Sequence, residues 1–254
     1  MRRLLLAFLI ALSASACGKK GPLIYPDLLV PEAPKEVTLW QSGLGMKFSF
    51  FLPQKDRAGR PLTDLAGVKV MKRETIPAQE EVCPACTSAF RLFRTLYVDF
   101  RDEGAARRYG NLMVVLDSDV TLARNYTYTI VPFTKDGVDG QGSAPVTATM
   151  VEPPPEPSLR VIPTVTDIRL EFGGRTPAAG TFMGYNIYRA VKGEPLPFLP
   201  LNKEPVRGKS YTDSGLDRYL TYRYAARTVV RLPTGEKVES GLSNQEDGAL
   251  RNEE

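Results

Sequence analysis

The sequence contains no histidine, only three cysteines and a single tryptophan. Without histidine, the side chain that most often acts as a general base near neutral pH is missing. No G-x-S-x-G or S-x-x-K spacing occurs, and no pair of carboxylates is singled out by its setting. The sequence therefore predicts a protein that is not an enzyme and that holds no cofactor.

Long hydrophobic runs are also missing after the first residues. A membrane-spanning helix would need roughly 20 apolar residues in succession, and no later segment approaches that length. The one apolar run, Leu4–Leu12, follows Arg2 and Arg3 and precedes four small residues, 13–16. This order is typical of a secretory signal peptide. Removing residues 1–16 takes two arginines from a formal net charge of +4 and leaves +2. Such a small charge gives no reason to expect a nucleic-acid partner.

Cys17 directly follows this segment, in the run Ala-Ser-Ala-Cys of residues 14–17. The run resembles a bacterial lipobox, whose cysteine receives diacylglycerol and a fatty acyl chain, although Leu is preferred where Ala14 stands. Residues 14–16 also fit an ordinary A-x-A cleavage site. The lipid is favoured because Cys83 and Cys86 can pair, which leaves Cys17 over. With Gly18 next, the resemblance implies a lipid anchor in the outer membrane, on its periplasmic side or exposed at the surface.

Residues 17–26 read Cys-Gly-Lys-Lys-Gly-Pro-Leu-Ile-Tyr-Pro. This run resembles the start of the small lipoproteins that assist maturation of the lipopolysaccharide-export translocon, which implies insertion against an outer-membrane barrel protein. The favoured alternative is a basic, proline-stiffened tether beside anionic head groups. The candidate partner-binding residues are Gly18, Lys20, Gly21, Pro22, Leu23, Tyr25 and Pro26.

Short apolar–polar alternations bounded by turn residues recur through the rest of the chain, and this pattern predicts an all-β sandwich or barrel. Two proline-rich stretches interrupt it, and we interpret them as a stalk and an interdomain spacer, because proline keeps a segment extended. The predicted division is a signal peptide 1–16, a lipidated tether 17–32, a first domain 33–151, a linker 152–157, a second domain 158–246 and a disordered tail 247–254.

The two predicted domains repeat one ordered pattern, which is stronger evidence than a single copy. In both, a Leu precedes a Tyr by six residues. The matched segments are Gly67–Arg73 with Gly184–Arg189, Met46–Phe50 with Asp167–Phe172, and Leu122…Tyr128 with Leu216…Tyr222.

The segments Gly184–Arg189, Tyr211–Leu216 and Tyr222–Ala226 resemble a bacterial fibronectin type III domain. The resemblance covers residues 158–246 well and 33–151 more weakly, and it implies two tandem immunoglobulin-like β-sandwiches. It also implies that Tyr128 and Tyr222 pack at a corner beside the preceding Leu. The family's buried Trp belongs on the second strand, whereas Trp40 falls on the first. The residues expected to fill that space are Phe48, Phe50, Leu170 and Phe172.

The first domain carries about 23 extra residues, since Gly67 and Leu122 lie 55 positions apart but Gly184 and Leu216 only 32. We place this insertion at about 75–110, and insertions on a rigid scaffold often carry function.

The insertion contains Cys83-Pro-Ala-Cys86. Zinc needs four ligands, and haem attachment needs a histidine where Thr87 stands. A thiol-exchange site usually begins a helix, and these flanks show no such pattern. In an oxidising compartment, a structural disulfide is therefore favoured over a redox site.

These observations predict a non-enzymatic envelope lipoprotein that acts as a protein-binding or scaffolding module. Its expected partners are the membrane, through the lipid on Cys17, and another envelope protein. The first alternative is a carbohydrate- or lipopolysaccharide-binding lipoprotein that uses the insertion. The second is a thiol redox factor that uses Cys83 and Cys86.

Overall fold

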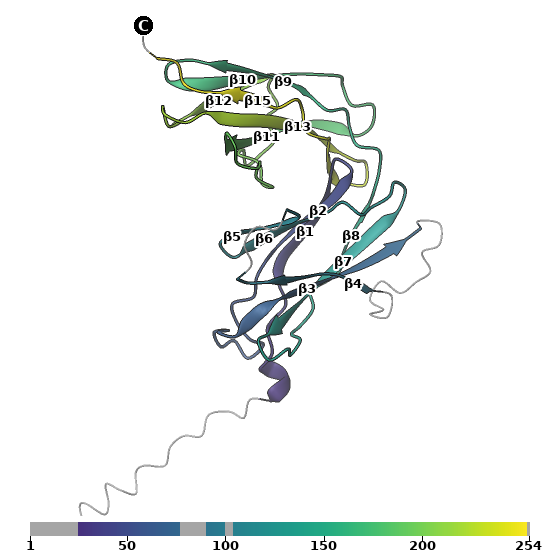
Figure 1. Ribbon diagram of the computed structural model, residues 1–254. Helices are drawn as coiled ribbons and strands as arrows, with labels where there is room; N and C mark the ends of the chain where they lie inside the picture. The colour runs from purple at the N-terminus through teal and green to yellow at the C-terminus, as the bar shows by residue number, and fades with distance from the viewer. Residues whose placement is uncertain (1–24, 77–89, 100–103, 253–254) are drawn as a thin grey trace, which may run out of the picture.

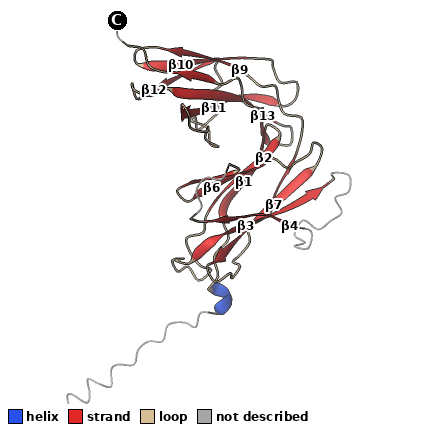
Figure 2. Ribbon diagram, viewed as in Figure 1, coloured by secondary structure: helices blue, strands red, loops and turns tan. Residues whose placement is uncertain are grey.

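A computed structural model describes residues 25–76, 90–99 and 104–252 of the chain. Apart from one 3-10 turn, η1 (Pro26–Leu28), the regular elements of these residues are all β-strands (Figures 1 and 2). They form two sandwiches, so the predicted all-β class with two tandem immunoglobulin-like sandwiches is confirmed. No helix among the described residues is long and apolar enough to cross a membrane.

The first sandwich packs a sheet of order β1-β2-β6-β5 against a sheet of order β4-β3-β7-β8. Neighbouring strands within both sheets are antiparallel. The strands are β1 (Lys35–Ser42), β2 (Gly45–Phe51), β3 (Leu65–Thr75), β4 (Arg91–Tyr97), β5 (Ala106–Tyr109), β6 (Leu112–Asp117), β7 (Asn125–Thr134) and β8 (Val146–Thr149).

The second sandwich packs a sheet of order β12-β10-β9 against β11 and β13, and β13 also pairs with both β14 and β15. It therefore repeats the strand arrangement of the first sandwich with fewer strands. The strands are β9 (Ser158–Pro163), β10 (Asp167–Gly173), β11 (Thr181–Val191), β12 (Ser210–Ser214), β13 (Tyr222–Arg231), β14 (Lys237–Glu239) and β15 (Glu246–Gly248).

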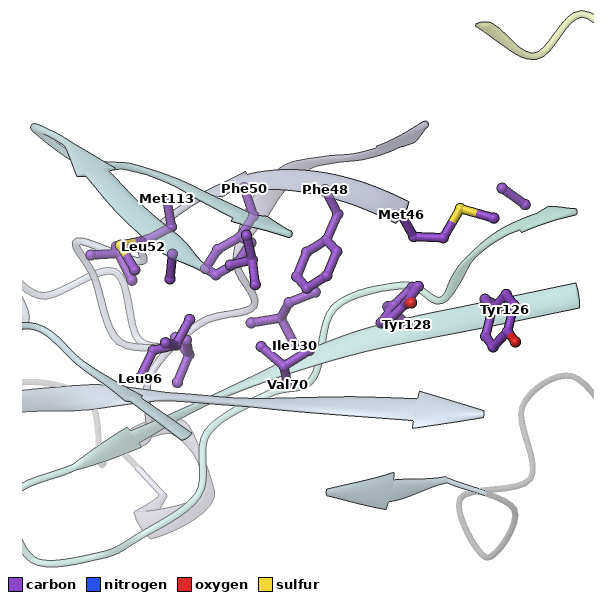
Figure 3. Packing of buried hydrophobic residues seen from close by; sticks show 14 of the residues in the cluster. Met46, Phe48, Phe50, Leu52, Val70, Leu96, Met113, Tyr126, Tyr128 and Ile130 are labelled. Atoms are coloured by element: carbon purple, nitrogen blue, oxygen red, sulfur yellow. The ribbon is translucent and has the colours of Figure 1, made fainter. Parts of the chain in front are cut away.

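Side-chain alternation along each strand builds the core of the first sandwich. Figure 3 shows Phe48 and Phe50 of β2 pointing toward Tyr128 and Ile130 of β7. The Phe48 and Tyr128 rings stack with their centroids 4.7 Å apart. The predicted core positions Phe48, Phe50, Leu170 and Phe172 are all buried, and Trp40 lies on β1.

One predicted detail of the repeat is wrong, and the correct corner tyrosine of the first sandwich is Tyr126. Its hydroxyl accepts a hydrogen bond from the Thr121 amide at 2.7 Å, just as the Tyr222 hydroxyl accepts one from the Asp217 amide at 2.9 Å. The leucine counterpart of Leu216 is Val120, which packs on the core, whereas Leu122 is 41% exposed. Both candidate residues are apolar, and only packing distinguishes them.

Tyr128 instead donates its hydroxyl to the buried carboxylate of Asp117 at 2.6 Å, and Lys72 lies 2.7 Å from the same carboxylate. The second sandwich repeats this arrangement: Tyr224 donates to Asp213 at 2.8 Å, and Arg189 contacts that carboxylate at 2.8 Å. The two sandwiches thus contain equivalent triads of a cation, an aspartate and a tyrosine: Lys72–Asp117–Tyr128 and Arg189–Asp213–Tyr224. Each triad joins the two sheets of its sandwich through an aspartate carboxylate that is paired with the cation and accepts a hydrogen bond from the tyrosine.

The extra residues of the first sandwich include β4 and β5. Between β11 and β12, the second sandwich has a long loop, residues 192–209, whose Val206 forms a single bridge with Tyr185. The insertion therefore adds an edge strand to each sheet of the first sandwich. The two cysteines, Cys83 and Cys86, lie outside the described residues.

Candidate functional site

A short parallel strand pair joins the two sandwiches. Ser42 of β1 is in register with Glu239 of β14, and this pairing makes one continuous sheet of β11, β13, β14, β1, β2, β6 and β5. Gln41 exchanges two hydrogen bonds with the backbone of Val151, at 2.7 and 3.0 Å, where the chain leaves the first sandwich. The proline-rich linker therefore does not by itself set the angle between the sandwiches.

A loop of the second sandwich also covers the outer face of the first sandwich's β1-β2-β6-β5 sheet. Arg107 donates to the Leu196 carbonyl at 2.7 Å, and the Phe198 amide donates to the Tyr109 hydroxyl at 3.0 Å. The Arg107 guanidinium lies 4.8 Å from the centre of the Phe198 ring. Val114, on that outer face, is fully buried. The described residues therefore form one body with an extensive junction.

Lys47 and Glu239 form an ion pair at the centre of this junction. The Lys47 ammonium lies 3.1 Å from Glu239 Oε2, and the two side chains are only 4% and 3% exposed. The same carboxylate accepts hydrogen bonds from the Ser42 hydroxyl at 2.6 Å, the Asn186 amide at 2.6 Å and the Tyr188 hydroxyl at 2.9 Å. Four donors thus satisfy Glu239, as a buried charge requires.

Burial and neighbouring charges shift the pKa values of these groups. Burial alone would raise the pKa of Glu239, but Lys47 and the hydrogen bonds from Ser42 and Asn186 outweigh it and lower the pKa to about 2. Burial lowers the pKa of Lys47, against the attraction of Glu239. Burial, reinforced by the charge of Glu239, raises the pKa of Tyr188. Glu239 is therefore ionised and Tyr188 protonated at neutral pH.

A groove of about 490 Å³ opens beside this pair, between β1, the 192–209 loop and the turn before β14. Its volume falls within the range of about 300–1,000 Å³ that is usual for small-molecule sites, which often lie between domains. Both sandwiches supply its lining. The lining includes Trp40, Asn186, Pro200, Lys203, Glu236 and Lys237.

A second groove, of about 590 Å³, lies on the outer face of the β4-β3-β7-β8 sheet, remote from the junction. Strand β4 forms its rim and pairs only with β3, so the other side of β4 is open among the described residues. Leu92 and Tyr97 of β4 are each 57% exposed. The apolar lining includes Met71, Phe90, Leu92, Val131 and Pro145.

Of the candidate partner-binding residues, the structure describes two. Tyr25 is 69% exposed, and Pro26 opens η1. The others, Gly18, Lys20, Gly21, Pro22 and Leu23, lie outside the described residues, as does the candidate lipidation residue Cys17. Within the described ranges, no group of three or more potential metal ligands is gathered.

Sequence reasoning missed the junction residues Lys47 and Glu239. Lys47 alternates with core residues along β2, a pattern that predicts a solvent-facing lysine. A signal was present in principle, because Lys47 lies within the strongly apolar segment Gly45–Leu52. It did not identify the partner, which is 192 positions away.

Searches against protein-family models and against curated proteins found no match. Among solved structures, the chain is similar to the FN1–FN3 domains of chicken CNTN1. That comparison has 14% sequence identity and a TM-score of 0.34, and it covers 88% of this chain and 69% of the other. The strand order of the two sandwiches is itself that of immunoglobulin-like folds.

Proposed function

We propose that this chain is a lipid-anchored, non-enzymatic envelope protein that holds a protein partner on its first sandwich. The observation that carries the proposal is the edge of β4 that is left unpaired among the described residues, beside a large apolar groove. Sandwiches of the fibronectin type III kind commonly mediate protein binding or scaffolding.

The β4 edge has the features of a strand-addition site. An extended peptide can continue a sheet by pairing with an open strand and by placing alternate side chains in adjacent pockets. Charged side chains usually protect an exposed strand edge from pairing with other chains, and Arg91 and Arg94 of β4 place positive charge at this edge. Leu92 and Tyr97 act in the opposite sense, because they expose apolar surface beside that edge. A partner strand would cover both.

The junction suits a scaffolding role because it fixes the second sandwich relative to the first. In Figure 1, η1 and β10 lie at opposite ends of the molecule, with the junction between them. An anchor on Cys17 would therefore put the first sandwich nearer the membrane and its β4 edge within reach of other envelope proteins. The second sandwich would extend away from the bilayer.

Site-specific photo-crosslinking in intact cells tests this proposal. A photoreactive phenylalanine replaces Leu92 on the β4 rim or, as the control, Tyr219 of the second sandwich, which is 92% exposed. We expect one discrete protein adduct from position 92 and none from position 219. Equal labelling at both positions, or no adduct at 92, would contradict the proposal. Deleting residues 18–26 in the same strain measures what the tether segment contributes to the adduct.

A further inference from the structure

We propose that the groove between the two sandwiches binds a sugar ring carrying a negatively charged group, stacked on Trp40. This site is distinct from the β4 edge and goes beyond the scaffolding role. Its lining residues come from β1, β11, β13, β14 and the 192–209 loop, so it exists only while the junction is closed.

Trp40 supplies an aromatic surface whose position is fixed. It is half-buried on the outward side of β1, and the Lys47 ammonium lies 5.5 Å from its ring centre. The ion pair with Glu239 holds that lysine in place. The face of an aromatic ring carries partial negative charge, so it attracts the weakly positive C–H groups on the flat side of a sugar. Because the ring is already ordered, stacking on it costs little conformational entropy.

The polar groups around the ring determine which substituents fit. Glu239 also lines the groove, but its carboxylate is fully engaged by Lys47, Ser42, Asn186 and Tyr188 and therefore offers nothing to a ligand. Asn186 uses its amide group toward that same carboxylate. The polar contribution to a ligand must therefore come from the rim.

The charges at the rim favour an anion. Lys203 and Lys237 are exposed lining residues, and neither has an ion-pair partner among the described residues. Glu236 is the one opposing carboxylate outside the central pair, and it accepts a hydrogen bond from the Thr234 hydroxyl at 3.2 Å. Two ammonium groups against one carboxylate leave a net positive rim beside an aromatic platform. A carboxylate or phosphate on the sugar would complement it.

Trp40 is the only tryptophan of the chain, so all tryptophan fluorescence comes from a residue that lines the groove. The experiment titrates the full-length protein in detergent with glucuronic acid, glucose 6-phosphate, glucose and tetraglutamate. We expect a saturable change in Trp40 emission with the two acidic sugars and at least tenfold weaker binding of glucose. The double variant Lys203→Ala/Lys237→Ala should weaken the acidic sugars to the level of glucose. Lys209→Ala, an exposed lysine outside the groove, should bind like the original protein.

Three results would overturn the proposal. The first is no saturable change at about 10 mM of either acidic sugar, well above a weak Kd of about 1 mM. The second is equal affinity for glucose and glucuronic acid. The third is tighter binding of tetraglutamate than of the acidic sugars, which would make the groove a peptide site. Trp40→Phe, measured by calorimetry, checks the stacking contribution separately: retained folding with unchanged affinity would also count against it.

Discussion

The ammonium of Lys47 in the first sandwich lies 3.1 Å from the carboxylate of Glu239 in the second, and both side chains are almost fully buried. The pair connects residues 192 positions apart in the chain. Its removal from water is compensated only while the sandwiches stay together, because the remaining hydrogen bonds to Glu239 come from Ser42, Asn186 and Tyr188 on both sides of the junction.

Removing one member of this pair should open the junction. Lys47→Ala leaves Glu239 buried without its counter-charge, which typically costs about 3–5 kcal/mol. We expect a lower Tm and a larger radius of gyration in small-angle X-ray scattering. The double variant Lys47→Met/Glu239→Leu removes both charges but leaves the Ser42, Asn186 and Tyr188 donors without their acceptor, so it should recover only part of the loss. An unchanged scattering profile for Lys47→Ala would show that the junction does not depend on the pair.

Acid should weaken the junction through Glu239. The pKa of Glu239 is about 2 in the folded protein, compared with about 4.3 for an unfolded glutamate. A carboxyl group whose pKa is lower in the folded than in the unfolded state stabilises the folded protein at pH values above its unfolded pKa. That stabilisation is lost as the pH falls from about 4.3 to about 2. At about 1.4 kcal/mol per pKa unit, the lowered pKa of Glu239 contributes roughly 3 kcal/mol to the unfolding free energy at neutral pH.

The measurement compares unfolding free energies of the original protein and Glu239→Gln between pH 5 and pH 2. Other carboxylates titrate in both proteins, so the difference between them isolates Glu239. The difference should shrink toward pH 2. A constant difference would mean that the pKa of Glu239 is the same in the folded and unfolded protein.

The sequence predicted contacts within a strand's own sandwich better than contacts between the two sandwiches. Alternation along β2 predicted the core positions of Phe48 and Phe50, because burial on one face of a strand leaves a period of two. The choice between Val120 and Leu122 at the corner could not be made from composition, since both are apolar. The junction could not be predicted for a different reason: Lys47 occupies an outward position on β2, and it is the second sandwich that buries it, through Glu239 of β14, Tyr188 of β11 and the Phe198 carbonyl of the loop.

The two glycines that begin the repeated strand pattern should tolerate no side chain. A Cβ on Gly67 would collide with the Leu96 carbonyl, and one on Gly184 would lie 2.5 Å from the Val206 carbonyl oxygen. Both glycines sit at irregularities in the strand register, and Gly184 has a φ of +134°. We expect Gly67→Ala and Gly184→Ala each to lower the unfolding free energy by more than about 1 kcal/mol. Gly59→Ala, at a φ of +82° but with open space around it, isolates the backbone contribution. Equal losses at all three positions would argue against the steric cause.

Tyr128 and Tyr126 should behave differently when their hydroxyls are removed. Tyr128 donates to the buried Asp117 carboxylate, and a hydrogen bond to a charged group contributes about 1.5–3 kcal/mol. Tyr126 accepts from the Thr121 amide, a neutral bond worth about 1 kcal/mol. Urea unfolding of Tyr128→Phe and Tyr126→Phe should therefore show the larger loss for Tyr128. The reverse order would argue against the assigned roles.

The lipid anchor is tested directly at Cys17. Intact-mass analysis of the protein purified from membranes should show a chain that begins at Cys17 and carries diacylglycerol and a fatty acyl group. Two or three acyl chains are enough for stable anchoring, because each buried CH₂ contributes about 0.8 kcal/mol. Cys17→Ser should shift the protein from the membrane fraction to the soluble periplasmic fraction, while Cys83→Ser/Cys86→Ser should leave it on the membrane. A Cys17→Ser protein that stays membrane-bound would contradict the anchor, and an unacylated chain beginning at Cys17 would support simple A-x-A processing instead.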